Sequence, residues 1–200
     1  MALAAQPPGR RERNKQAKLE RITAAASELF AAHGVDDVTT QQIADAADIG
    51  TGTLFLYAKT KGELLLLVQN VNYAAALDRG RTAAARADDA LGGLLALLTP
   101  VVECNRVQVD NGRTYLREMV FGDPTEPRHA EALAIVGQTE QATADLLTRH
   151  TALDESEAST LAGVISAILF LTMASSAHAS SSVAEIVEAI RIQVAAVLPR

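Results

Sequence analysis

Apolar residues recur at the spacing of an α-helix through most of the chain. In the first such stretch, steps of three and four residues separate the positions on one face, which are Leu19, Ile22, Ala26, Leu29 and His33. No run of alternating apolar and polar residues indicates a strand. The pattern therefore predicts an all-α protein of about nine helices. We place these helices at 18–33, 39–47, 51–57, 63–81, 83–107, 113–121, 127–150, 154–178 and 183–197.

A helix, a sharp turn and a very short helix are predicted between Thr39 and Tyr57. Thr39 or Thr40 can cap the first of these helices, and Gln42 stands where the partner of a Thr39 capping box is expected. Residues 48–50 form the turn. A helix-turn-helix of this kind presents its second helix to the major groove of DNA, which is about 12 Å wide and accepts one helix.

The second of these helices has small, hydrogen-bonding residues at its amino end. Thr51 and Thr53 can contact base edges or a thymine methyl, and Gly52 lets the backbone approach a phosphate. Tyr57 and Lys61 follow, where a phenol and an ammonium can each hold a phosphate oxygen. A plain helical hairpin with polar tips would have the same spacing, so these residues alone leave two interpretations open.

Composition and charge narrow the class of protein. The chain is 48% hydrophobic and 21% charged with a net charge of -6, values that are typical of an ordered globular protein. Residues 1–62 carry eight Lys or Arg against seven Asp or Glu, whereas residues 63–200 carry ten against seventeen. Residues 10–21 contain six basic and two acidic residues, which indicates either contact with a polyanion or a solvated helix face.

Several kinds of site are not expected. Cys104 is the single cysteine, so no disulfide can form within the chain, and we expect its side chain to pack inertly. The four histidines lie far apart in sequence, and we expect no metal and no cofactor. No G-x-S-x-G motif and no Gly-rich phosphate loop occurs, so no enzyme is expected. The amino terminus lacks an apolar core of signal-peptide length, which predicts a cytoplasmic location.

The sequence between Val38 and Leu66 resembles the TetR family of bacterial transcriptional regulators. The residues that match the family pattern in register are Thr39, Ile43, Ala44, Gly52, Thr53, Leu54, Phe55, Tyr57 and Lys61. The resemblance covers about residues 18–67 and implies that DNA is bound there. The predicted DNA-binding residues are Thr39, Thr40, Gln41, Thr51, Gly52, Thr53, Phe55, Tyr57 and Lys61. Two residues depart from the pattern, because Gly50 stands where a Ser or Thr cap is usual and Ala58 where Phe is usual.

We expect a disordered basic tail at 1–17, and the resemblance implies a helix-turn-helix DNA-binding domain at 18–62 and a helical ligand-binding and dimerisation domain at 63–200. In the last part, residues 158–184 carry no charge. Their strongly apolar core, 161–174, would span only about 21 Å, which is short of the roughly 30 Å of a bilayer. We therefore expect no membrane contact and a homodimer formed through the last two helices. An internal core helix is the alternative.

The middle helices offer candidates for a small-molecule pocket, which needs apolar walls and a few polar groups. These candidates, each of which could also be an ordinary core or surface residue, are Tyr73, Asn105, Gln108, Tyr115, Met119, Phe121 and Met173. The predicted function is a ligand-responsive regulator, a repressor released from double-stranded operator DNA by a small, largely apolar inducer. A helical adaptor that keeps the fold but binds no DNA is the alternative, which the departures at Gly50 and Ala58 leave open.

Overall fold

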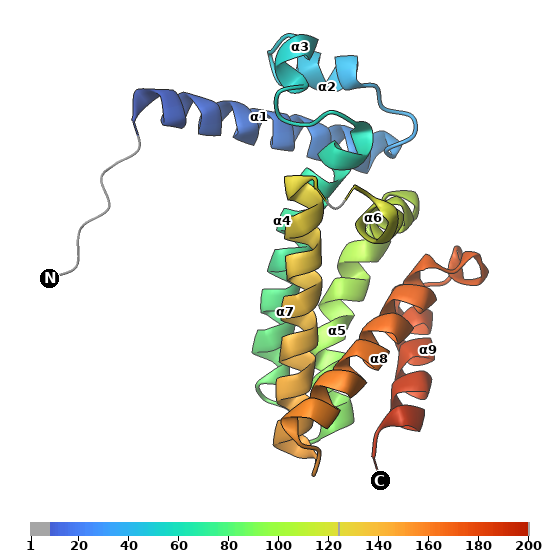
Figure 1. Cartoon of the computed structure of the whole chain (residues 1–200). Helices are drawn as coiled ribbons and strands as arrows, with labels where there is room; N and C mark the ends of the chain where they lie inside the picture. The colour runs from blue at the N-terminus through green and yellow to red at the C-terminus, as the bar shows by residue number, and fades with distance from the viewer. Residues whose placement is uncertain (1–8, 124, 200) are drawn as a thin grey trace, which may run out of the picture. The chain divides into compact units, whose positions relative to one another are not determined.

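The computed structural model describes residues 9–123 and 125–199, which contain nine α-helices and no β-strand (Figure 1). The chain divides into two compact units, Met1–Val68 and Gln69–Arg200. The all-α prediction is confirmed, and the division lies a few residues beyond the boundary expected after Gly62. The helices are α1 (Arg10–His33), α2 (Thr40–Ala46), α3 (Thr51–Leu54), α4 (Lys61–Ala84), α5 (Ala90–Arg106), α6 (Val109–Phe121), α7 (Pro127–His150), α8 (Glu155–Ala174) and α9 (Val183–Val197), with a 3-10 turn (Ser176–His178) after α8.

The first helix starts earlier than the apolar pattern suggests. α1 begins at Arg10, so the expectation of a disordered tail over residues 1–17 is wrong for residues 10–17. These first two turns are exposed, and their Arg, Lys, Gln and Glu side chains are good helix formers that extend an existing helix without needing an apolar face. Gly9 precedes them in an extended conformation as the N-cap. Residues 1–8 lie outside the described residues.

Apolar side chains from three helices hold the first unit together. α1 packs against α2, and α2 packs against α3. The fully buried side chains here include those of Ile22, Phe30, Ile43 and Leu54. Gly34 ends α1 with a φ of 81°, in the left-handed region that glycine adopts without steric cost, and its N–H donates to the Phe30 carbonyl at 2.9 Å. The predicted end of this helix at Gly34 is confirmed.

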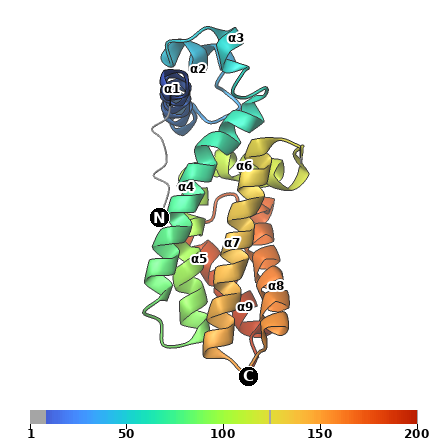
Figure 2. The same ribbon diagram turned by 60° about the vertical axis from the view of Figure 1, so that its left-hand side comes forward.

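The second unit is a helical bundle with its own core. α7 and α8 run side by side, α5 packs against α6, α7 and α9, and α9 also contacts α8 (Figure 2). Leu94, Leu97, Leu147 and Ile165 are fully buried between these helices. Each such side chain contributes about 1.5–3 kcal/mol by leaving water, so this shared core is the main stabilising term of the unit.

The junction of α5 and α6 differs from the sequence expectation. Residues 110–112, which were predicted to form a turn, belong to the first turn of α6. The Gln108 side chain caps this helix by accepting a hydrogen bond from the Asn111 N–H at 2.6 Å. α5 and α6 meet at a bend of 111°, and Gly112 approaches the Asn105 carbonyl so closely that a Cβ would overlap it. The Asp-Asn-Gly sequence therefore lies in the first turn of α6, where its glycine permits the close approach to α5.

Replacing Gly112 by Ala tests this contact. We expect Gly112→Ala to lower the free energy of unfolding by about 2–3 kcal/mol, because the new methyl group must push α6 away from α5. Gly137→Ala is the matched control, since a Cβ at that exposed position of α7 meets nothing within 4 Å. It should raise stability by about 0.5–1 kcal/mol through helix propensity. Urea unfolding followed by circular dichroism measures both, and equal effects would contradict the close contact.

Cys104 lies on α5, where burial raises the pKa of its thiol to about 11. At pH 7.5 the thiolate fraction is then about a hundredfold lower than for a free cysteine, and the thiolate is the reactive form. We expect a chromogenic disulfide reagent to label the folded protein at least a hundredfold more slowly than the protein in urea. Equal labelling rates at pH 7.5 would show that the thiol is accessible and unshifted.

Candidate functional site

The helix-turn-helix is formed by α2, a tight turn and α3. Thr39 and Gln42 make the predicted capping box at the start of α2, with the Thr39 N–H donating to Gln42 Oε1 at 2.8 Å and the Gln42 N–H donating to Thr39 Oγ1 at 3.2 Å. In the turn, Asp48 adopts a positive φ of 53° and its carboxylate lies 3.4 Å from the Arg21 guanidinium of α1. Gly50 precedes α3 without a side-chain cap, as its departure from the family pattern suggested.

Side-chain hydrogen bonds join the amino-terminal halves of α2 and α3. The Thr51 hydroxyl donates to Gln41 Oε1 at 2.6 Å, and Gln41 Nε2 donates to Asp45 at 2.7 Å. Gln41 and Gly52 are exposed, and Phe55 keeps 45% of its surface accessible. None of the nine residues predicted to bind DNA, all of them in the described part of the chain, is buried.

Tyr57 and Lys61 make contacts within the chain that the sequence did not reveal. The Tyr57 hydroxyl donates to the Lys15 carbonyl at 3.4 Å, which ties the residues after α3 to α1. The Lys61 ammonium donates to the carbonyls of Val35 and Asp36, each at 2.9 Å. These bonds engage two of its three N–H groups, so Lys61 fixes the loop between α1 and α2 and has one donor left for another partner.

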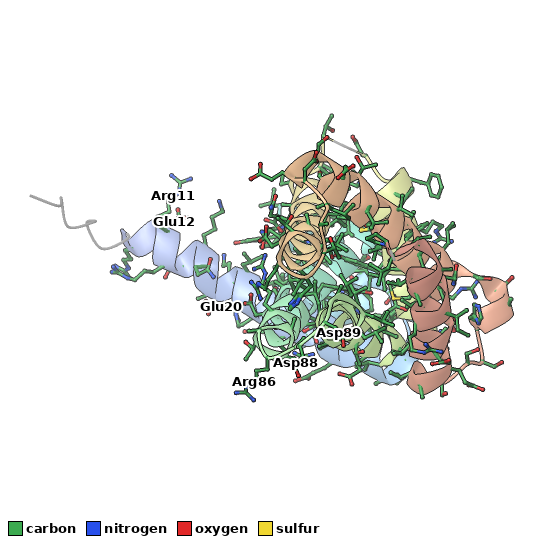
Figure 3. The ribbon with its side chains drawn as sticks, turned by 90° about the horizontal axis from the view of Figure 1, so that it is seen from below. Arg11, Glu12, Glu20, Arg86, Asp88 and Asp89 are labelled. Atoms are coloured by element: carbon green, nitrogen blue, oxygen red, sulfur yellow. The ribbon has the colours of Figure 1, made fainter. Side chains whose placement is uncertain are left out.

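A basic groove lies between the first turns of α1 and the residues of α3. It is a concavity of about 930 Å³ whose lining residues are Arg10, Arg11, Glu12, Asn14, Lys15, Lys18, Thr53, Leu56 and Tyr57. The lining thus contains four basic residues and one acidic residue. Figure 3 shows the Arg11 and Glu12 side chains projecting from α1. Leu56 is 82% exposed. The excess of bases is visible in the sequence, but the groove depends on residues 10–17 forming a helix, which the apolar pattern does not predict.

An apolar cavity of about 330 Å³ lies within the second unit, between α4, α5, α6, α7 and α8. Of the seven predicted pocket residues, the four that line it are Tyr73, Tyr115, Met119 and Met173. Asn105 lies behind Tyr73 and donates to its hydroxyl at 2.7 Å. Gln108 caps α6, and Phe121 is 78% exposed, so neither of them lines the cavity. Residues of α7 and α8, which the sequence did not single out, form most of the remaining wall.

Two stacked tyrosines form one wall of the cavity. The rings of Tyr73 and Tyr115 lie 4.4 Å apart at an angle of 10°. The Tyr115 hydroxyl donates to Asn70 Oδ1 at 2.9 Å, and Asn70 Nδ2 donates to the Arg128 carbonyl at 2.9 Å. Burial raises the pKa of both phenols well above the usual value, so both remain neutral near pH 7. The wall therefore offers rings with satisfied polar ends.

The last two long helices leave apolar side chains exposed. Val164 and Leu171 of α8 are 43% and 64% exposed, and Ile192 and Val197 of α9 are 56% and 39% exposed. In the described part of the chain, α8 is the one helix that is by itself long and apolar enough to cross a membrane, and 33% of its 18-residue apolar stretch is buried. α5 and α6 are long and apolar enough only when taken together, and they are bent by 111°. The core helix of a soluble protein meets the same criteria, so this is weak support for a span.

Known proteins share both the helix-turn-helix sequence and the whole fold. Residues 22–68 match the family described as bacterial regulatory proteins, tetR family. No curated protein sequence is significantly similar to the chain. The structure is similar to that of FadR from Thermus thermophilus, a TetR-family transcriptional repressor in complex with lauroyl-CoA (TM-score 0.68, 23% identity), covering 91% of this chain and 96% of that one.

Two further solved structures extend the similarity. A TetR transcriptional regulator from Rhodococcus sp. RHA1 has a TM-score of 0.70 at 16% identity, covering 92% of this chain and 97% of that one. FadR from Bacillus subtilis, in complex with stearoyl-CoA, has a TM-score of 0.63 at 15% identity, covering 88% and 96%. Residues 22–68 thus match the tetR family of bacterial regulatory proteins in sequence, and the chain has the fold of the solved TetR-family transcriptional regulators.

Proposed function

We propose that the protein is a cytoplasmic, ligand-responsive repressor that binds double-stranded operator DNA as a homodimer and is released by a small, largely apolar molecule. The observation that carries this proposal is the basic groove beside the exposed residues of α3. A groove with four bases and one acid, on a chain with a net charge of -6, concentrates positive charge where the helix-turn-helix is exposed.

In this proposal, the two sides of the DNA contact have different tasks. Gly52 and Thr53 of α3 face the bases, where a hydroxyl can bond a base edge and a missing side chain permits close approach. The bases of α1, among them Lys15 and Lys18, hold the phosphates and set the register of α3 in the groove. Phosphate contacts supply most of the affinity, and base contacts supply the specificity.

The apolar cavity supports a small-molecule ligand. Its size and its mostly apolar wall are typical of ligand pockets. The FadR proteins from Thermus thermophilus and Bacillus subtilis, which have this fold, are described with acyl-CoA molecules bound. Tyr73 lines the cavity and lies on the same helix as Lys61, which holds the loop before α2. We infer that a ligand shifts α4, and linkage then requires DNA and ligand to weaken each other's binding equally.

The exposed apolar residues of α8 and α9 support the homodimer. Burying Leu171 and Ile192 against a second copy would remove from water a surface that the monomer leaves open. Two-fold symmetry also suits operator DNA, because two reading helices can then enter successive major grooves about 34–36 Å apart.

DNA binding is tested by retardation of fragments from the promoter region of the protein's own gene at low salt. We expect retention that weakens steeply as salt is added, and Lys18→Ala should lower the slope of log affinity against log salt by about one. Arg86→Ala is the matched control, since Arg86 projects from the loop after α4 and is remote in sequence from the helix-turn-helix (Figure 3). It should leave the slope unchanged.

The same assay decides between the repressor and the adaptor that binds no DNA. Retention that survives the double change of Thr53 and Tyr57 to Ala would show that α3 does not read DNA. No retention of any fragment by the dimer at low salt would overturn the repressor and favour the adaptor.

Leu171→Asp tests the dimer. We expect this charge on α8 to convert the protein to a monomer in sedimentation and to lower DNA affinity at least tenfold, because the two half-sites are no longer bound together. Val71→Asp on α4 is the control, since Val71 is exposed to a similar extent (61% against 64%) but lies away from α8 and α9 in the sequence. A Leu171→Asp protein that stays dimeric, with unchanged circular dichroism, would contradict this interface.

A further inference from the structure

The cavity of the second unit has one polar end. Glu140 on α7 lies ten residues before the carboxyl end of its helix, and Ser166 on α8 lies eleven residues after the start of the next helix. At 1.5 Å per residue both are about 15 Å from the loop that joins the two helices. Thr139 and Gly163 line the cavity at the same level, whereas Leu133 and Met173 line it farther from that loop. The cavity therefore has a polar end and an apolar body.

The polar end carries a single charge. Among the described residues that line the cavity, Glu140 is the only Asp, Glu, His, Lys or Arg. No hydrogen bond or ion pair joins its carboxylate to another described residue, and it is only partly exposed. The neighbouring Thr139 hydroxyl donates to the Ile135 carbonyl at 2.9 Å, so it does not donate to the Glu140 carboxylate.

The charge of Glu140 determines which polar group of a ligand is favoured at this end of the cavity. Apolar walls and partial burial reduce screening, so a carboxylate attracts a cation and repels an anion more strongly here than in water. Residues 63–200 carry seven more acids than bases, which adds repulsion for an anionic ligand. No Lys or Arg lines the cavity to offset these charges.

We propose that the cavity binds a cationic amphiphile, an amine whose ammonium group contacts Glu140 and whose apolar body lies against the tyrosine wall and the far end of α7. The proposal rests on the proposed ligand-responsive function and names the chemical class of its ligand. From Ala132 to Glu140 the cavity follows eight residues of α7, or about 12 Å, which suits a hydrocarbon chain of about eight carbons.

A matched series of eight-carbon probes tests the charge preference. Octylamine, 1-octanol, octanoate and octanoyl-CoA share the apolar body and differ in the polar group. We expect calorimetric titration of the full-length protein to give the tightest binding for octylamine, weaker binding for octanol and the weakest for octanoate and octanoyl-CoA. Glu140→Gln should weaken octylamine binding about tenfold and leave octanol binding unchanged.

The control is Glu103→Gln, which removes the same charge from an exposed position of α5 that does not line the cavity. It should leave all four affinities unchanged. Octanoate or octanoyl-CoA binding as tightly as octylamine would overturn the proposal, as would an octylamine affinity that does not depend on Glu140 or no binding by any probe at 1 mM. Retention of DNA by the ligand-free protein is measured separately, so a failure of this ligand class is distinguished from a failure of the DNA-binding function.

Discussion

The candidate DNA-binding surface depends on holding in place a helix that cannot be stable alone. α3 has four residues, contains a glycine and has no side-chain cap, whereas isolated helices need many more residues to form. Three contacts hold it in position. Leu54 is fully buried in the first unit, Thr51 is bonded to Gln41 of α2, and Tyr57 just beyond α3 is bonded to the backbone of Lys15. The surface offered to DNA is thus a product of the tertiary structure.

The second unit fixes its cavity by a different means. The stacked rings of Tyr73 and Tyr115 are held by Asn105 and Asn70, which bond their hydroxyl groups. Because these polar ends are already paired inside the protein, the rings turn only their apolar surface to the cavity. In the proposed ligand class, the polar contact is then made at the other end of the cavity, by Glu140.

The sequence predicted well those features that depend on local chemistry. The capping box of Thr39 with Gln42, the end of α1 at Gly34 and the bounds 127–150 and 183–197 are all found, since each follows from neighbouring residues. It failed where contacts between distant residues decide. Residues 110–112 form a helix start because α6 packs closely on α5, and a turn motif alone does not report that contact.

In the candidate site, too, the features that depend on local sequence were predicted and those that depend on distant contacts were not. Periodicity and family resemblance predicted α2, α3 and their candidate DNA-binding residues, but not the bonds from Lys61 to the carbonyls of Val35 and Asp36, which join residues about 25 positions apart. The basic groove was missed because two solvated turns of α1 have no apolar pattern. In the cavity, residue type predicted Tyr73, Tyr115, Met119 and Met173 but also the exposed Phe121, whereas the wall contributed by α7 and by most of α8 depends on how these helices pack.

The burial pattern of α3 has a consequence for how such a protein diversifies. Leu54 alone among its four residues is buried, so the positions that face outward, Gly52 and Thr53, bear little of the folding free energy. Under the proposed DNA-binding function, substitutions there would change which nucleotides are recognised while the scaffold stays intact. Duplicated copies of the gene can therefore acquire new target sequences one residue at a time, without passing through unfolded intermediates.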